Sequence, residues 1–370
     1  MKTTLFSRGS YLDTGDERAF FISANGYDGF RSRHELLYHS KDFTRVFVIL
    51  GGPGTGKSSL IRRIAEVGLE CNASCEYIYC SSDPLSLDGI ILEKGEQKIA
   101  VLDGTAPHAR AAHVPGAIDE ILHLGECWDA VLLSSERNRI LGLQEAGGDA
   151  YARARRYLSL AGEASRALYR EQEKILDMKK LRAAVERELR GTRVSNTPNE
   201  TVRYRTACST NGIVHLNTFM RDAEVILVSD ECGAGHQYLN AMREHLRVEG
   251  VHEWWHFPSC FDDGITEGIY LPKNKRLYLI DNGEKNQKKI NIKRFVIKER
   301  EVVCRRHIRT LLRLREQMLE AACLSLSHAG AFHFLLEEIY GRAMDFGKKE
   351  GMTEALAERI RGMLGGSKRD

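Results

Sequence analysis

Residues 46–60 read VFVILGGPGTGKSSL, and this stretch decides the fold. It opens with Val46–Leu50, an apolar and mostly β-branched or aromatic run that is typical of a buried strand. Gly51–Ser58 then fits the phosphate-binding pattern G-x-x-x-x-G-K-[ST]. An apolar stripe at helical spacing follows and is expected to stop at Gly68; it consists of Leu60, Ile61, Ile64 and Val67. A strand, a glycine loop and an amphipathic helix in this order predict a site for nucleotide phosphates.

Each residue type in this glycine loop, Gly51–Ser58, has a physical role in such a site. Glycines let successive N–H groups point into one concavity, and the helix that follows adds partial positive charge. Lys57 is expected to reach the β- and γ-phosphates, and the Ser58 hydroxyl to join the Mg²⁺ shell. The predicted nucleotide contacts are Gly51, Gly52, Pro53, Gly54, Thr55, Gly56, Lys57, Ser58 and Ser59. The alternative is a glycine turn that only resembles the motif.

Two later acidic residues are candidates for the same site. Asp103 ends the apolar run Lys98–Asp103 and is predicted to hold Mg²⁺ together with Ser58. Asp83 follows another strand-like run and is predicted to act as a base that orients water or an acceptor hydroxyl, with Asp88 a weaker candidate. Turn formation is the alternative role for Asp103, before a glycine, and for Asp83, before a proline.

The loop after Asp103 adds candidate contacts at the carboxyl edge of the sheet, where ligands of open α/β sheets bind. It carries His108, Arg110 and His113. His108 is predicted to meet a phosphate or a second substrate, and an ordinary surface histidine is the alternative.

The sequence repeats itself at an interval of about 179 residues. VILVSDECGAGHQYL (Val225–Leu239) aligns with the opening stretch and puts Gly235 on Gly56, an offset of 235 − 56 = 179. LDGIIL (87–92) matches TEGIYL (266–271) at the same offset, and IAVLDG (99–104) matches LYLIDN (277–282), which puts Asp281 on Asp103. SANG (23–26) echoes STNG (209–212), and RALYREQEK (166–174) resembles GRAMDFGKK (341–349). The order of these blocks indicates a tandem duplication.

The second loop has lost the groups that bind phosphate. This alignment puts His236 in the place of Lys57 and Gln237 in the place of Ser58, while Asp230 replaces Gly51. Carboxylates in the loop repel phosphates, so we expect one competent site per chain, with a structural or regulatory second half. A different ligand at His236 is the alternative.

These patterns predict an α/β fold of two P-loop NTPase domains, 1–195 and 196–370, divided within the polar stretch Gly191–Thr201. Each domain is expected to contain a parallel sheet flanked by helices, with a hairpin-like pair of strands at 89–92 and 98–102. The segments 117–190 and 299–364 are rich in helix-forming residues and predict a helical extension in each half.

Composition excludes few function classes, but it bears on nucleic-acid binding, on zinc sites and on the cellular compartment. The 370 residues carry a net charge of +3, too little to favour a nucleic-acid motor, and Lys285–Lys298 is the one basic cluster that would support this class. A solvated strand or loop is the other reading of that cluster. The nine cysteines include Cys71, Cys75 and Cys80, whose spacing matches no common zinc site. Without a signal peptide or an apolar run near 18 residues, the chain is expected to be cytoplasmic, with reduced thiols and no membrane partner.

Four blocks carry a family resemblance: GGPGTGKSSL, CSSDPLSLDGIIL (80–92), VLDGTAPH (101–108) and HVPGAIDEILHLGECWD (113–129). The chain resembles a family of tandem P-loop ATPases, found mainly in Firmicutes and described as uncharacterised ATPases or nucleotide kinase-like proteins. The resemblance implies ATP binding by Gly51–Ser58 and roles for Asp83, Asp103 and His108 in the site. Members of that family can have a second P-loop. This sequence differs from them, because His236 and Gln237 replace the lysine and the serine of its second loop.

The base-reading motif Asn-Lys-x-Asp of guanine-specific proteins is missing from the sequence, so ATP with Mg²⁺ is the expected ligand. We expect an Mg²⁺-dependent ATPase. The alternatives are a kinase for a small molecule or nucleotide, and a nucleotide-switched binding module that meets a protein partner. The sequence identifies no second substrate.

Overall fold

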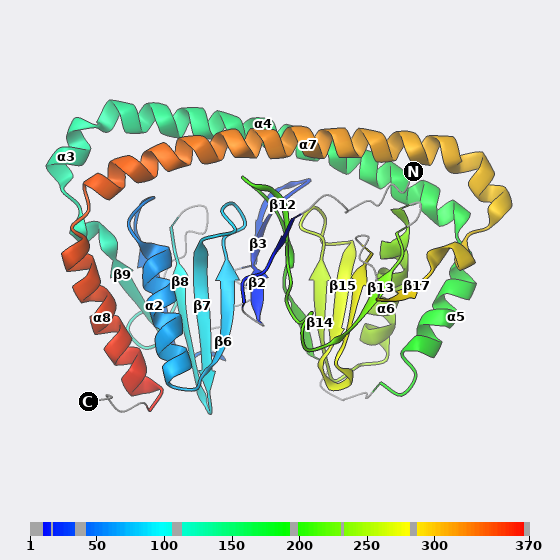
Figure 1. Ribbon diagram of the computed structural model, residues 1–370, viewed down its shortest axis with the longest axis horizontal. Helices are drawn as coiled ribbons and strands as arrows, with labels where there is room; N and C mark the ends of the chain where they lie inside the picture. Colours follow the sequence, from blue (N-terminus) through cyan, green and yellow to red (C-terminus); the bar gives the residue numbers. More distant parts are fainter. Residues whose placement is uncertain are drawn as a thin grey trace.

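The computed structural model describes residues 10–15, 18–33, 42–105, 113–192, 199–230, 233–281 and 287–365. Over these residues the protein is a mixed α/β structure. Two six-stranded sheets lie side by side beneath a pair of long helices (Figure 1). The predicted α/β class is confirmed.

The first sheet holds the strand that precedes the glycine loop at an inner position. Its order is β2 (Ala19–Phe21), β6 (Ser74–Tyr79), β7 (Leu87–Lys94), β8 (Gln97–Asp103), β5 (Arg45–Leu50) and β9 (Asp119–His123). β5 runs parallel to β8 and β9, whereas β7 runs antiparallel to both of its neighbours. A tight turn at Gly95 joins β7 to β8, and such turns connect antiparallel strands. The predicted hairpin is confirmed, but the sheet is mixed, not wholly parallel.

The second sheet repeats this order strand for strand. It contains β10 (Asn199–Val202), β14 (Glu253–Pro258), β15 (Thr266–Leu271), β16 (Arg276–Ile280), β13 (Glu224–Val228) and β17 (Lys288–Ile290), with η4 (Pro272–Asn274) between β15 and β16. Gly89 of β7 lies opposite Leu102, and Gly268 of β15 lies opposite Leu279. The two glycines are therefore equivalent, in agreement with the predicted duplication.

One amphipathic helix follows β5 in the first sheet and β13 in the second. These are α2 (Lys57–Glu70) and α6 (Gly235–Val248), which pack against β7 and β15. The predicted apolar stripe of α2 is fully buried; it consists of Leu60, Ile61, Ile64 and Val67. The predicted stop at Gly68 is wrong, because α2 continues for two more residues. A Cβ at Gly68 would lie 2.5 Å from Leu92 Cδ2, so this glycine allows close packing on the sheet.

Two hairpins lie between the sheets and join the halves. They are β3 (Ser23–Gly26) with β4 (Gly29–Ser32), and β11 (Thr206–Ser209) with β12 (Gly212–Leu216), to which β1 (Ser10–Leu12) adds a parallel strand. Phe21 and Tyr204 exchange backbone hydrogen bonds of 2.9 and 3.0 Å. These two residues hold equivalent places in the two halves, at an offset of 204 − 21 = 183, so an approximate twofold axis passes between them.

Each hairpin reaches across to the opposite half. The N–H of Tyr27 donates to the carbonyl of Phe261 over 2.9 Å, and the N–H of Thr210 donates to the carbonyl of Ser82 over 3.0 Å. The offset of 210 − 27 = 183 corrects the sequence alignment of SANG with STNG, which differs by 209 − 23 = 186. Short polar turns align in several registers, and only the strand pairing fixes the right one.

The helical extensions form two arms that run antiparallel along both sheets (Figure 1). The first arm contains α3 (Ala130–Ser135), α4 (Arg137–Ile175) and α5 (Met178–Glu188), and the second contains α7 (Lys298–Arg342) and α8 (Phe346–Met363). Short turns η2 (Leu124–Cys127) and η5 (Ile292–Phe295) lead into them. The helix prediction for 117–190 is wrong at its start, because 119–123 forms β9 and the helices begin at Ala130.

The two arms are exchanged between the halves. α5 packs on α6 of the second half, while α8 packs on α2 of the first. Equivalent backbone hydrogen bonds fix the start of α8 and of α5 to the opposite half. The N–H of Asp345 donates to the carbonyl of Cys127, and the N–H of Asp177 donates to the carbonyl of Phe295, each over 2.8 Å. Both aspartates also cap the helix that follows them. Each half is therefore covered partly by a helix that belongs to the other half of the duplication.

These bonds place the arms at an offset of 345 − 177 = 168. The tail alignment from sequence, at 341 − 166 = 175, is therefore wrong by seven residues at this point. Its cause is the helical composition of both tails, which makes shifts of two turns hard to distinguish. At the offset of 168, Gly162 of α4 corresponds to Gly330 of α7. A Cβ at these positions would lie 2.7 Å from Tyr27 Cβ and 2.9 Å from Thr210 Cβ, so both glycines admit the hairpin turns.

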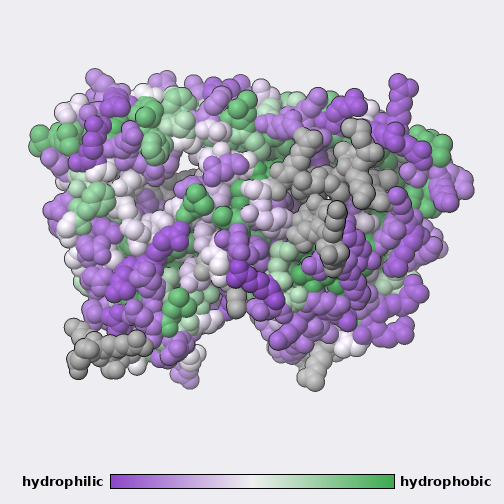
Figure 2. Space-filling model, in the orientation of Figure 1, coloured by the Kyte–Doolittle hydropathy of each residue, from purple (hydrophilic) through white to green (hydrophobic). Residues whose placement is uncertain are grey.

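α7 is the one helix in the described part of the chain that is long and apolar enough to cross a membrane by length and composition. This corrects the expectation that no apolar run approaches that length. One such helix is weak evidence, because core helices of soluble proteins pass the same test of length and composition. In this structure α7 packs along α4 and against β11 and β12, and 33% of its apolar window is buried. Hydrophilic side chains interrupt hydrophobic ones along the edge where these helices run (Figure 2).

The exchanged packing predicts the stability of variants in α8. Ile360 is fully buried in the same cluster as Ile61 and Ile64 of α2. Ile360→Ala is expected to lower the free energy of unfolding by about 2–5 kcal/mol, because it leaves a cavity in the first-half core. Leu324→Ala, at a side chain 61% exposed on α7, is expected to change it by less than about 0.5 kcal/mol. Urea unfolding measures both, and equal small effects would contradict the docking of α8.

Candidate functional site

The glycine loop leaves β5 and enters α2, as the sequence predicts. Gly54 and Gly56 have φ of 68° and 79°, a region that glycine adopts without strain. The hydroxyl of Thr55 donates to the carbonyl of Gly52 over 2.9 Å, and the hydroxyl of Thr105 donates to the carbonyl of Gly51 over 2.8 Å. The loop is thus held from within and by the segment that follows β8.

Lys57 and Asp103 lie together beside this loop. Nζ of Lys57 is 3.6 Å from Oδ2 of Asp103, and their side chains are only 14% and 12% exposed. The same ammonium donates to the carbonyls of Gly51 and Gly52, each over 2.8 Å. Oδ1 of Asp103 accepts the N–H of Thr105 over 2.8 Å. The parallel pairing of β5 with β8 therefore brings the predicted lysine and the predicted carboxylate into one place.

The other predicted polar groups are Ser58 on α2, Asp83 between β6 and β7, and Asp88 on β7. The hydroxyl of Ser58 accepts the N–H of Leu87 over 3.0 Å, which ties α2 to the start of β7. Asp83 is exposed in the turn, and its carboxylate accepts the N–H of Leu85 over 3.3 Å. This bond agrees with the alternative role of Asp83 as a turn former. Asp88, in contrast, is 5% exposed.

Asp88 is the buried carboxyl of this group. It precedes Gly89, which pairs with Leu102, so Asp88 and Asp103 are neighbours on adjacent strands. Burial raises the pKa of Asp88 to about 7, and the negative charge of Asp103 adds to the shift. Two carboxyl groups and one lysine therefore share the ends of β7, β8 and the glycine loop.

The end of α7 covers the loop from above. A Cβ at Gly54 would lie 2.9 Å from Cα of Glu337, and one at Gly52 would lie 3.2 Å from Tyr340 Cε1 and 3.4 Å from Trp128 Cζ2. The indole N–H of Trp128 is buried and has no hydrogen-bond partner within the described ranges. These contacts are not predictable from the sequence, because no local pattern shows that a distant helix returns to the loop.

The predicted Mg²⁺ ion would have few protein ligands. The described residues contain no group of three or more His, Cys, Asp and Glu side chains placed to hold a metal ion. Mg²⁺ beside a nucleotide needs only one or two protein oxygens, together with phosphate and water. Ser58 and Asp103 offer oxygen atoms of that type, so the donor set fits.

The predicted contacts in the loop after β8 are only partly described. His108 and Arg110 lie outside the described residues. His113 is exposed, and its N–H donates to Oδ2 of Asp119 over 2.8 Å. Cys71, Cys75 and Cys80 form no disulfide bond within the described residues.

In the second half, a carboxylate of the chain itself occupies the start of the helix. Asp230 is 1% exposed, and its Oδ1 accepts the N–H of Gly235 over 2.9 Å at the N-terminus of α6. An anion at this end of a helix is stabilised by the helix dipole and by free N–H groups. The Asp230 carboxylate thus lies at the start of α6, where a bound phosphate would otherwise accept the helix N–H groups. Glu231, the second acidic residue of this loop, lies outside the described residues.

The register between the two loops corrects the sequence alignment. α2 and α6 have 14 residues each, and in both the second residue after the helix has positive φ; these residues are Asn72 and Gly250, at an offset of 250 − 72 = 178. Gly235 therefore holds the place of Lys57, and His236 that of Ser58. The sequence alignment at an offset of 179 matched Lys57 with His236 and Ser58 with Gln237, in each case one residue too far along the chain. The reason is that the second loop is one residue shorter than the first.

The predicted survival of the metal-side carboxylate at Asp281 is also wrong. Asp103 pairs with Ile49, and the equivalent pair in the second sheet is Ile280 with Val228. An isoleucine therefore stands where Asp103 stands, and Asp281 follows it and forms an ion pair of 2.9 Å with Lys289. Two residues are lost in the turn before β16, not one.

The interior of the second half holds neutral polar groups. His236 is 3% exposed and packs on Tyr169 at 4.5 Å between ring centroids. Burial lowers its pKa to about 3, and the charge of Arg315 adds to this, so the ring is neutral at pH 7. Burial likewise raises the pKa of Glu267, the counterpart of Asp88, to about 7.

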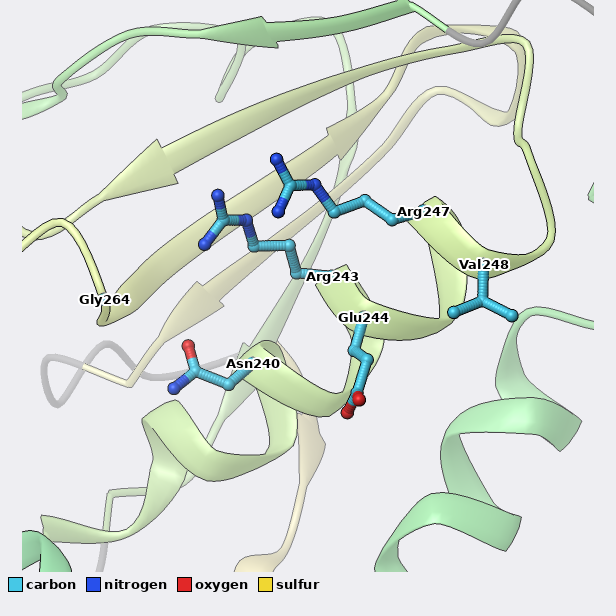
Figure 3. A pocket seen from close by; sticks show the side chains of 6 residues that line it. All are labelled: Asn240, Arg243, Glu244, Arg247, Val248 and Gly264. Atoms are coloured by element: carbon cyan, nitrogen blue, oxygen red, sulfur yellow. The ribbon is translucent and has the colours of Figure 1, made fainter.

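A hollow of about 390 Å³ lies on the outer face of α6 (Figure 3). The guanidinium groups of Arg243 and Arg247 point to the same side of the helix, away from the carboxylate of Glu244. Both donate to the carboxylate of Glu200, over 3.2 and 2.7 Å. This partner neutralises part of their charge, and the hollow does not repeat the arrangement at the glycine loop.

No protein family matches the chain, and the comparisons with curated proteins and with solved structures gave no match. The resemblance to tandem P-loop ATPases therefore remains a prediction.

The buried Glu267 gives the folded protein a pH dependence. The unfolded chain releases this proton near pH 4.5 and the folded protein near pH 7, so its stabilising effect is present below about pH 4.5 and lost as pH rises through about 7. Glutamine does not titrate. The stability of Glu267→Gln relative to wild type is therefore expected to increase from about pH 5 to pH 8.

Urea unfolding at several pH values measures this difference. Glu244→Gln, at a side chain 66% exposed, serves as the control and is expected to follow wild type. A difference between Glu267→Gln and wild type that stays constant over this range would contradict the shifted pKa.

Proposed function

We propose that the protein binds ATP with Mg²⁺ at the glycine loop of its first half and hydrolyses it, with one competent site per chain. One observation carries the proposal: Lys57 and Asp103, both largely buried, lie 3.6 Å apart beside a glycine loop that joins β5 to α2. This combination supports the binding of nucleotide phosphates, with the fold of each half as a P-loop NTPase domain.

In the proposed site the loop N–H groups and the start of α2 receive the phosphates. Lys57 stabilises the charge that develops on the transferred phosphoryl group. Ser58 and Asp103 hold Mg²⁺, which supplies charge neutralisation between the phosphates when bound. Asp83 and Asp88 are the carboxyl groups from which we propose a base for an attacking water, and the burial of Asp88 makes it the better shielded of the two.

The second half has no such role in this proposal. Gly235 and Ile280 stand in the places of Lys57 and Asp103, and Asp230 fills the N-terminus of α6 with negative charge. We therefore propose a supporting or regulatory role for this half.

We further propose that the protein is cytoplasmic and has no nucleic-acid or membrane partner. The basic stretch near Lys288 agrees with the lack of a nucleic-acid partner, because Lys288 and Lys289 form ion pairs with Glu224 and Asp281.

The contact between α7 and the loop favours a second candidate function, a nucleotide-switched binding module. Glu337 and Tyr340 of α7 pack on Gly54 and Gly52, so a ligand in the loop bears directly on the arm that links both halves. Tight binding with negligible turnover would favour this candidate, and ATP consumption that rises with an added phosphate acceptor would favour a kinase.

Lys57→Ala tests the binding site. Its Kd for ATP–Mg²⁺ is expected to rise at least about tenfold, because a charged hydrogen-bond donor to the phosphates is lost. Isothermal titration calorimetry measures this change. Lys289→Ala removes the same charge from the second half and is expected to bind as wild type does. Equal ATP affinity of Lys57→Ala and wild type would show that the site lies elsewhere.

Asp103→Asn tests the metal side of the site. Asparagine keeps the size of the side chain but removes its charge, so the variant is expected to bind ATP without Mg²⁺ at least as tightly as wild type does. The gain in affinity on adding Mg²⁺ and the ATPase rate should both fall. A variant with unchanged Mg²⁺ dependence would contradict the assignment of Asp103.

A further inference from the structure

Helix α8 brings a buried lysine to the glycine loop. The Lys349 side chain is 6% exposed, and its Nζ donates to the hydroxyl of Ser59 over 3.0 Å. A Cβ at Gly56 would lie 3.3 Å from Cε of Lys349 and 3.7 Å from its Nζ. The ammonium group therefore lies against the first turn of α2, where Ser59 directly follows Lys57 and Ser58.

This position is unfavourable for a cation in the protein alone. The N-terminus of a helix carries partial positive charge, and Lys57 already adds a full charge there. Burying an ammonium group costs free energy unless an anion pairs with it. Among the described residues its carboxylate partner is Glu350, at 3.3 Å and 59% exposed, and such an exposed pair contributes little. An anion in the glycine loop would offset the charges of both lysines.

The second half provides an internal comparison. Asp177 and Asp345 cap α5 and α8 in the same way and define the offset of 168, which places Leu181 where Lys349 stands. Leu181 is fully buried in the core that contains α6. The helix that covers the altered loop thus presents a leucine, and the helix that covers the complete loop presents a lysine.

We infer that Lys349 is a second phosphate-binding lysine, supplied to the first-half site by the C-terminal helix. The inference rests on the proposed function and extends it: a nucleoside di- or triphosphate is held by Lys57 from its own loop and by Lys349 from the exchanged arm. Because α8 continues the long helix α7 from the second sheet, phosphate binding also strengthens the docking of this arm on α2.

The test compares ADP binding by wild type, Lys349→Met, Lys349→Gln and Lys349→Arg. Methionine and glutamine are expected to raise the Kd about tenfold, since each loses a charged hydrogen-bond donor, and arginine is expected to recover part of the affinity. Lys348→Met is the matched control, because Lys348 is the exposed neighbour that donates to the carbonyl of Glu126. Thermal unfolding without nucleotide verifies that the variants are folded.

Hydrogen exchange of α8 gives a second readout that a packing role alone would not change. ADP is expected to slow exchange in Phe346–Met363 of wild type and to have a smaller effect in Lys349→Met. If wild type and Lys348→Met bind ADP, Lys57→Ala does not, and the uncharged Lys349 variants bind as wild type does, the inference is overturned and the proposed function stands. If wild type binds no nucleotide, both are overturned.

Discussion

The exchange of the helical arms is the constraint on which the rest of the structure depends. Each arm leaves its own sheet, runs along the other arm, and docks on the opposite sheet through a backbone bond between Asp345 and Cys127 or between Asp177 and Phe295. Only in this arrangement can α8 cover α2 and the end of α7 lie on the glycine loop. The second half of the chain therefore completes the surroundings of a site whose loop belongs to the first half.

One scaffold carries two different loops because small changes at three positions decide the electrostatics. At the start of α2 the chain offers a lysine, a serine and a facing carboxylate, to which α8 adds a second lysine. At the start of α6 it offers a glycine, a buried neutral histidine and an isoleucine, with Asp230 in the place of an anion. The second half keeps the fold, since its core is apolar in the same places, while the positive charge that Lys57 places at the first loop has no counterpart.

The sequence predicted what local patterns determine. The strand, loop and helix around Lys57, the hairpin before Asp103 and the duplication all follow from spacing and residue type. The exact registers do not, because a loss of one or two residues in a turn leaves the apolar pattern intact, and so Asp281 was matched to Asp103 wrongly. The exchange of the arms, and with it Lys349, depends on contacts between segments almost 300 residues apart, on which periodicity carries no information.

The proposed site requires that one chain binds one nucleotide, in its first half. Titration of the purified protein with ATP–Mg²⁺ in a calorimeter measures the stoichiometry directly. We predict one ATP per chain. Two equivalent sites, or none, would contradict it.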